Sequence, residues 1–184
     1  MVKTKRFTVK YRRKQSKQTD YKLRRSLLSS AKPRLVVRKS IKNLTAQLIA
    51  YDKRGDKVIA ASTTQELKKL GWNYGNNIPT AYLLGLLIGK KAQQKQVKEA
   101  ILDAGLTSST KGSKLYAVLK GAIDAGLTIP HSASVLPSQE RLNGEHIINY
   151  FHKVSSQDSA QFKSSAPEGM LKQLNEIKQK IIGK

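Results

Sequence analysis

Positive charge is concentrated at the start of the chain, and this feature constrains the fold more than any other. Residues 1–42 contain 16 Lys or Arg residues and one acidic residue, Asp20, and so hold +15 of the formal net charge of +23. Residues 1–18 are basic and polar, without an apolar period that could build a core. We therefore predict that residues 1–18 are disordered in isolation and that the later residues form the hydrophobic core.

This charge pattern indicates a polyanionic partner, because so many uncompensated cations favour contacts with phosphates. One alternative is a solvated basic tail, which the number of uncompensated charges disfavours. The other is an arm that binds a membrane surface, which is disfavoured because no apolar helical face accompanies the basic residues. The chain has no cysteine, which excludes disulfides, thiolate zinc sites and a Cys nucleophile. We see neither a signal peptide nor the ~20 apolar residues of a spanning helix. We expect an intracellular, soluble protein that binds nucleic acid and has neither a membrane nor a small-molecule partner.

Alternating apolar and polar residues predict strands in the first third of the chain. Three strands are expected, at residues 34–40, 44–51 and 58–62, and short turns join them into an antiparallel meander. In the first of them, Leu35 and Val37 should face the core, while Arg34 and Arg38 share the opposite face. That face is either solvated or an RNA platform, and we favour RNA because the basic arm lies next to it.

Apolar residues at helical spacing, with capping residues at their ends, predict six helices. They are expected at residues 20–28, 63–70, 79–92, 113–125, 139–153 (interrupted near Gly144) and 168–182. Gly85 and Gly89 should let their helix approach the sheet closely. Residues 97–103 follow this buried helix and are predicted to form a parallel strand. Residues 155–167 read as a linker, and the apolar stripe of the last helix should dock on the chain's own body, another protein being the alternative.

Two features have both a structural and an RNA interpretation. Trp72 either closes the end of a helix, which we favour, or stacks on a base. Gly112 and Ser113, followed by Lys114, place backbone N–H groups and a cation at a helix N-terminus, an arrangement that suits a phosphate.

No constellation of side chains predicts an enzyme. His146 and His152 are six residues apart, so they cannot form the i, i+4 pair of a zinc site. Asp52, Asp56, Asp103 and Asp124 could be imagined as a nuclease metal site, but local pairing with neighbouring basic residues explains the first two. We therefore predict no catalytic residue, no metal and no cofactor.

Several blocks of sequence occur in the order found in one known family. They are residues 11–14 (YRRK), 19–21 (TDY), 32–40 (KPRLVVRKS), 46–48 (AQL), 71–72 (GW), 81–83 (AYL), 85–87 (GLL), 121–127 (GAIDAGL), 129–132 (IPHS) and 144–147 (GEHI). In these blocks the chain resembles the 5S rRNA-binding protein of the large ribosomal subunit that is numbered eighteen in the universal scheme, in its archaeal and eukaryotic branch. The resemblance covers about residues 6–152.

The resemblance implies a three-layer α/β fold, with helices packed on a mixed sheet and an N-terminal arm buried in rRNA. It implies a structural role in the cytoplasmic ribosome, in which the protein binds 5S rRNA and helps dock it onto 23S rRNA at the central protuberance. The second 5S-binding protein of the large subunit, numbered five, would be a partner. We divide the chain into an arm with a short helix (1–32), an α/β 5S rRNA-binding domain (33–154) and a linker with a C-terminal helix (155–184).

The expected RNA-binding residues follow from the charge pattern and the resemblance together. They are Lys3, Lys5, Arg6, Lys10, Arg12, Arg13 and Lys14 of the arm, Tyr21, Arg24 and Arg25 of the first predicted helix, and Lys32, Arg34, Arg38, Lys39 and Asn43 of the first strand and its turns. The helix should direct Arg24 and Arg25 toward solvent or RNA. Lys111 and Lys114 are added on electrostatic grounds.

Overall fold

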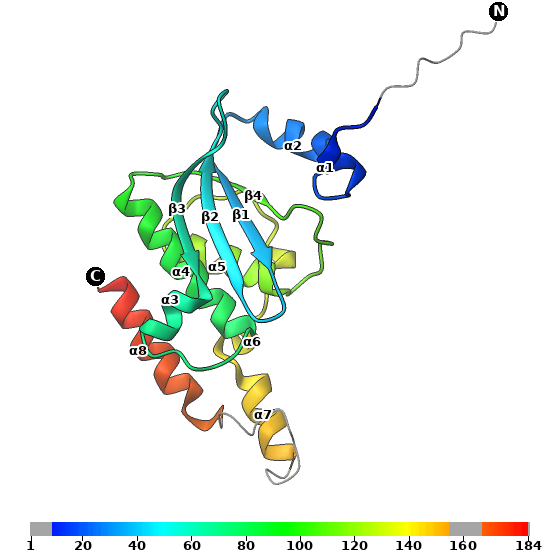
Figure 1. The fold of residues 1–184 in the computed structure, drawn as a ribbon. Coiled ribbons are helices and arrows are strands. Elements are labelled where there is room, and N and C mark those ends of the chain that lie inside the picture. Colours follow the sequence, from blue (N-terminus) through cyan, green and yellow to red (C-terminus); the bar gives the residue numbers. More distant parts are fainter. Residues whose placement is uncertain (1–8, 155–166, 184) are drawn as a thin grey trace, which may run out of the picture.

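The computed structural model describes residues 9–154 and 167–183 (Figure 1). The strands are β1 (Arg34–Lys39), β2 (Leu44–Ala50), β3 (Lys57–Thr63) and β4 (Ile101–Asp103). The helices are α1 (Arg12–Gln15), α2 (Tyr21–Leu28), α3 (Thr64–Lys69), α4 (Ile78–Gln94), α5 (Lys114–Asp124), α6 (Gln139–Asn143), α7 (Glu145–Lys153) and α8 (Met170–Ile182). Two short 3-10 turns lie at Ala133–Val135 and Pro167–Gly169.

The four strands form one mixed sheet in the order β3-β2-β1-β4. The β1–β2 and β2–β3 pairs are antiparallel, and β4 is parallel to β1. The predicted meander, the parallel strand and the α/β class are therefore confirmed. Strand β4 is shorter than predicted, since it begins at Ile101 and only an isolated bridge between Glu99 and Thr128 precedes it.

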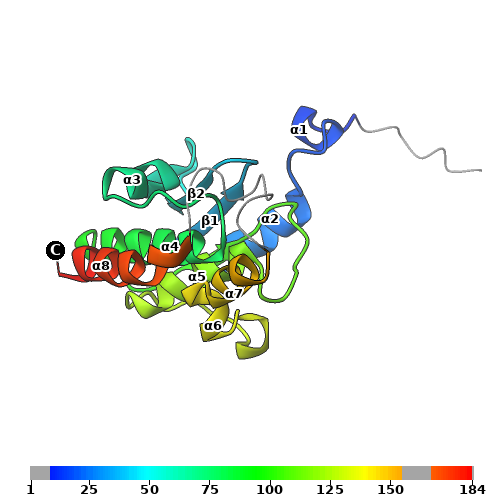
Figure 2. The same ribbon diagram turned by 90° about the horizontal axis from the view of Figure 1, so that it is seen from below.

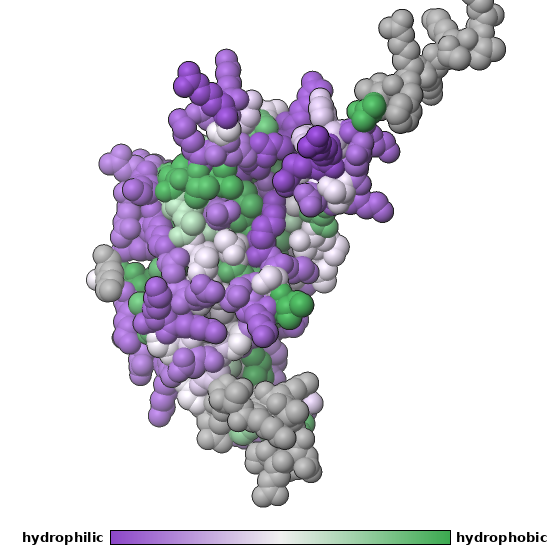
Figure 3. Space-filling model, viewed as in Figure 1, coloured by the Kyte–Doolittle hydropathy of each residue, from purple (hydrophilic) through white to green (hydrophobic). Residues whose placement is uncertain are grey.

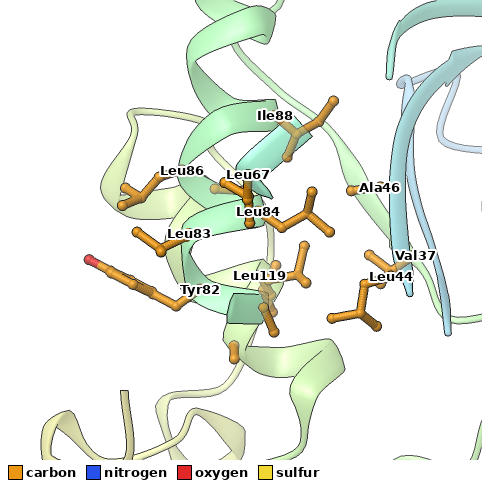
Figure 4. Packing of buried hydrophobic residues seen from close by; sticks show 14 of the residues in the cluster. Val37, Leu44, Ala46, Leu67, Tyr82, Leu83, Leu84, Leu86, Ile88 and Leu119 are labelled. Atoms are coloured by element: carbon orange, nitrogen blue, oxygen red, sulfur yellow. The ribbon is translucent and has the colours of Figure 1, made fainter. Parts of the chain in front are cut away.

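The hydrophobic core lies between one face of the sheet and helices α4 and α5. Val37, Leu44 and Ala46 point from the strands toward Leu84 and Ile88 of α4 (Figure 4). On the other side of α4, Tyr82, Leu83 and Leu86 point away from the sheet. Twelve of the seventeen residues of α4 are buried, so this helix is the centre of the fold, as its apolar sequence predicts.

Helices α4 and α5 cross at glycines, which corrects one prediction. A Cβ on Gly85 would overlap the backbone oxygen of Val118 in α5, and Gly89 faces Ala122 and Ala125 at the end of α5. Both glycines therefore allow close approach to α5 rather than to the sheet. The spacing of the two glycines indicates a close contact, but it does not identify the element on the other side.

We predict that Gly121→Ala strongly destabilises the protein. A Cβ at this position would overlap the backbone oxygen of Tyr82 and lie 2.8 Å from the backbone nitrogen of Leu86. Because backbone atoms cannot move aside cheaply, the free energy of unfolding should fall by about 1–3 kcal/mol or more. Chemical denaturation measures this loss. Gly75→Ala is the control, since a Cβ there has nothing within 4 Å, and equal stability of the two variants would contradict the prediction.

The C-terminal helix α8 packs on the chain's own body, as predicted. Its apolar stripe, which consists of Met170, Leu174, Ile177 and Ile181, is buried, and α8 runs alongside α4 (Figure 2). The ammonium group of Lys178 lies 4.8 Å from the centre of the Tyr82 ring. The Tyr82 hydroxyl donates a hydrogen bond of 2.9 Å to Asp124. Most of the predicted linker before α8, residues 155–166, lies outside the described residues.

Turns and caps follow the sequence closely. Gly144 has φ +84° and separates α6 from α7, and Gly71 has φ +99° just after α3, so both predicted helix ends are confirmed. Thr63 and Glu66 form the capping box of α3. The single turn α1 was not expected. It buries no side chain and so contributes nothing to the core.

Candidate nucleic-acid interface

The described part of the basic arm, residues 9–18, exposes all of its predicted RNA-binding residues. Lys10, Arg12, Arg13 and Lys14 are exposed on and beside α1. Only Arg13 is fixed by a side-chain bond that the structure shows, a 2.9 Å hydrogen bond from its Nε to the Thr19 hydroxyl. Lys3, Lys5 and Arg6 lie outside the described residues. The arm thus presents a dense set of cations at one end of the molecule, where hydrophilic side chains surround α1 and α2 (Figure 3).

Helix α2 connects the arm to the sheet, and its start is set by Asp20. The Asp20 carboxylate accepts hydrogen bonds from the backbone N–H groups of Lys22 and Leu23, at 2.9 and 3.1 Å. This confirms the predicted N-cap and occupies the only acidic residue of residues 1–42. The ring of Tyr21, which is half-buried, lies 5.1 Å from that of Tyr11 between centroids, so an aromatic contact joins α2 to the arm.

The two arginines of α2 behave differently, which corrects the prediction that both point to solvent or RNA. Arg25 is exposed. Arg24 instead donates from Nη2 to both carboxylate oxygens of Asp56, at 2.9 and 2.8 Å, across the gap to the β2–β3 hairpin. Its side chain is 33% exposed, so Arg24 is a tether between two elements.

Arg34 is buried, and the prediction that it lies on an exposed strand face is wrong. Its side chain is only 4% exposed and forms ion pairs with Asp103 at 2.7 Å and Asp56 at 2.6 Å. Its guanidinium is enclosed by Asp56 of the β2–β3 hairpin and Asp103 of β4, which reach it from two different elements. The alternation in the sequence correctly predicts which face of the sheet Arg34 lies on, but it does not predict which residues cover that face.

Arg38 lies four residues after Arg34 on the same face of β1 and remains half-exposed, at 48%. Its guanidinium donates to Asp103 Oδ1 at 3.2 Å and to the backbone oxygens of Val37 and Asp103, both at 2.9 Å. Burial raises the pKa of Asp103, but Arg38, the Gly105 N–H and Arg34 together hold this pKa below its ordinary value. The carboxylate is therefore charged and compensates the two arginines.

Of the remaining predicted residues, Lys32 lies between α2 and β1, whereas Lys39 and Asn43 lie at the other end of β1. Lys32 is paired with Glu99 at 2.6 Å, and Lys39 is exposed at the far end of β1. The side-chain oxygen of Asn43 accepts a 3.1 Å hydrogen bond from Thr64, which gives this residue a structural role in the turn. The structure therefore separates the arm with α2 from a second group at the β1–β2 turn.

Lys114 belongs to this second group, and Lys111 lies just before it. Lys114 Nζ donates to the backbone oxygen of Asn76 at 3.1 Å, and Asn76 in turn donates to the oxygens of Ser40 and Ile41 at 3.2 and 3.3 Å. Lys111 is exposed in the loop before α5. The N-terminus of α5 therefore lies beside the β1–β2 turn rather than beside the arm.

A polar cleft of about 470 Å³ separates the arm and α2 from the sheet. Its lining comprises the ionic side chains of Arg13, Asp20, Arg24, Arg34, Arg38, Asp56 and Asp103, together with Gln18, Thr19, Tyr21, Leu23, Leu27, Gly105 and Leu106. Asp56 and Asp103 are the residues of this region that sequence reasoning missed. Local pairing was expected for Asp56, but its partners are 32 and 22 residues away in the chain, and no sequence signal identifies them.

Trp72 is a core residue and not a stacking platform. Its side chain is 1% exposed, and the indole N–H donates to the Thr80 hydroxyl at 2.7 Å. The favoured interpretation is therefore confirmed, and base stacking by this residue is wrong.

Among residues 9–154 and 167–183, no group of three or more His, Asp or Glu side chains is placed to hold a metal ion. Within the same residues, no helix is both long and apolar enough to span a bilayer. The chemistry that this surface offers is ionic and hydrogen-bonding contact by exposed arginines and lysines.

Comparisons with known proteins identify relatives in the large ribosomal subunit, which is consistent with a surface that binds RNA. The sequence model of the family described as "Ribosomal large subunit proteins 60S L5, and 50S L18" matches residues 5–99 and 90–132. The chain is also similar to the large ribosomal subunit protein uL18 of Methanococcus maripaludis, with 45% identity over 191 aligned residues. The alignment covers 99% of each chain.

Proposed function

Because the chain belongs to the family of the large ribosomal subunit proteins 60S L5 and 50S L18, we propose that it binds 5S rRNA and helps dock the 5S ribonucleoprotein onto 23S rRNA in the central protuberance. Membership of this family makes it a structural, RNA-binding component of the large subunit of the cytoplasmic ribosome, and not an enzyme. The identity of the RNA, and the partnership with the large-subunit protein numbered five, are the proposed steps.

One observation supports this proposal most strongly: the distribution of charge around the arm. The acidic groups next to α2 are already engaged, since Asp20 caps the helix and Asp56 and Asp103 pair with arginines. The cations of residues 10–14 and Arg25 remain exposed beside them. Such a surface neutralises phosphates, which are the main contacts in backbone-led recognition of A-form RNA.

We assign the RNA contacts to two parts of the chain. Residues 1–32 supply the arm and α2, and part of the arm would reach 23S rRNA rather than 5S rRNA. Within residues 33–154, we assign RNA contacts to Arg38 and Lys39 of β1 and to the N-terminus of α5. Residues 155–184, which include α8, receive no RNA contact in this proposal, because the apolar stripe of α8 is used in packing on α4.

The test is selective binding in solution. The purified protein should bind 5S rRNA more tightly than tRNA in a filter-binding assay at physiological salt, because shape and backbone geometry differ while the charge density is similar. The chain lacking residues 1–18 should bind less tightly but keep the preference. Equal affinity of the full chain for both RNAs would contradict the proposed function, and loss of the preference on truncation would move recognition into the arm.

A further inference from the structure

We propose that Asp56 is a positioning residue that fixes the direction in which the arm leaves the body. The inference rests on the proposed RNA binding for its purpose, but its structural part concerns the free protein. Asp56 lies between β2 and β3, and the hairpin reaches up beside α2 (Figure 1). There it joins α2 to the sheet.

Asp56 bridges two arginines from different elements. Both of its carboxylate oxygens accept from Arg24 Nη2 of α2, and Oδ2 also accepts from Arg34 Nη2 of β1 at 2.6 Å. Arg34 is held in turn by Asp103 at the end of β4. A continuous chain of charge-assisted hydrogen bonds therefore runs from α2 through the hairpin to the edge of the sheet.

The two ends of this chain differ in rigidity. Arg34 is nearly completely buried and pinned by two carboxylates, so it is a fixed anchor. None of the eight residues of α2, all of which are described, is buried, and its Leu23 is 39% exposed. Apolar burial therefore holds α2 only weakly, and the Arg24–Asp56 pair is the side-chain ionic contact that the structure shows between α2 and the sheet.

The direction of α2 sets where the arm begins. Asp20 caps the start of α2, and Arg13 is bonded to Thr19 directly before that cap. The ring of Tyr11 contacts that of Tyr21, the first residue of α2, at an interplanar angle of 47°. Residues 11–28 therefore move with α2, and fixing α2 against the sheet places the cations of α1 before any RNA is bound. This corrects the prediction that all of residues 1–18 are disordered in isolation, since residues 11–18 are held to α2. A preplaced arm loses less conformational freedom on binding.

Substitution of Asp56 by Asn distinguishes this role from simple electrostatics. Loss of a negative charge alone should strengthen binding to RNA, whereas a loosened arm should weaken it. Asp52→Asn is the matched control, because Asp52 lies in the same hairpin and pairs only locally, with Lys57 at 2.6 Å. We expect unchanged or tighter binding of 5S rRNA by Asp52→Asn, and roughly threefold to tenfold weaker binding by Asp56→Asn.

A second measurement uses the free protein and so does not depend on the RNA. The chain has no cysteine, so spin labels can be placed at Lys22→Cys on α2 and Gln65→Cys on α3, both exposed positions. The distance between the labels should be narrowly distributed in the parent and in Asp52→Asn, and broad in Asp56→Asn. Since Asp56→Asn also removes a partner of buried Arg34, Arg24→Gln provides a gentler variant, with exposed Arg25→Gln as its charge-matched control.

RNA affinity and the distance between the spin labels together distinguish the positioning role of Asp56 from the proposed binding of 5S rRNA. A narrow distribution in both Asp56→Asn and Arg24→Gln overturns the positioning role, as does tighter RNA binding by Asp56→Asn. Broadening in these two variants, with neither control broadened, supports it. If the distribution broadens but the parent protein shows no preference for 5S rRNA, the positioning of the arm stands and the proposed function fails.

Discussion

Removal of residues 1–18 should weaken the binding of rRNA and make it less sensitive to salt. The segment contains eight Lys and Arg residues, and each phosphate contact that is lost lowers the slope of log affinity against log salt by ~0.7–0.9. A protein that neutralises about 6–10 phosphates loses about three to five orders of magnitude in affinity between ~50 and ~200 mM salt. Titrations with rRNA at several salt concentrations measure this slope for both chains.

The expected loss depends on which RNA is used. On isolated 5S rRNA the truncation should flatten the slope only partly, because we assign part of the arm to 23S rRNA. Assembly of the whole large subunit should suffer more than binding of 5S rRNA. An unchanged slope on 5S rRNA, together with normal incorporation into subunits, would contradict an RNA-binding arm.

A charge-matched pair of variants separates position from total charge. In the first, the exposed Lys10, Arg12, Arg13 and Lys14 are replaced by Gln. In the second, four exposed lysines of α3 and α8 are replaced: Lys68, Lys69, Lys172 and Lys180. These helices lie on the opposite side of the molecule from α1 and α2 (Figure 1). The first variant should flatten the salt slope, and the second should leave it close to that of the parent.

Arg34→Gln should destabilise the fold severely, whereas Arg38→Gln should not. Arg34 is 4% exposed and pairs with both Asp103, which is 8% exposed, and Asp56, which is 25% exposed. Its loss removes the cation shared by the two carboxylates and leaves only Arg38 beside buried Asp103, at a cost of up to about 3–5 kcal/mol. Arg38 is 48% exposed, although its partner Asp103 is only 8% exposed. Arg34 still neutralises this carboxylate when Arg38 is replaced, so the loss should be about 1 kcal/mol, close to that of an exposed ion pair. Chemical denaturation of the two single variants measures both effects.

The same two variants separate stability from RNA contact. Arg38→Gln should keep the parent's stability and lose affinity for 5S rRNA, because its guanidinium is accessible. Arg34→Gln should affect RNA binding only through the fold and the position of α2. If Arg34→Gln were as stable as the parent, its ion pairs would not hold the sheet and α2 together, and our account of this region would be wrong.

Local patterns in the sequence predicted most of the secondary structure. The alternation in residues 34–40 and the capping residues of α2 and α3 act within a few residues. The strand and the cap at Asp20 are confirmed, and of the two expected candidates Thr63 and Thr64 it is Thr63 that caps α3. The burial of Trp72 and the docking of α8 were also predicted correctly, because a large indole and an apolar helical stripe both need a partner.

What the sequence could not provide is the identity of distant partners. Arg34 is paired with residues 22 and 69 positions away, so its strand position alone suggested an exposed side chain. The glycines of α4 signalled a close approach, but only the fold shows that α5 is the neighbour. Arg24 was assigned to solvent or RNA for the same reason, since its partner Asp56 lies in another element.

The most direct test of the central claim is to identify the nucleic acid that accompanies the protein in its own cells. The full chain should be purified without nuclease at low salt, and the bound nucleic acid should be extracted and sequenced. We predict that 5S rRNA is strongly enriched over tRNA and other abundant RNAs. A preparation that carries heterogeneous DNA, or RNA without enrichment of 5S rRNA, would contradict the proposed function.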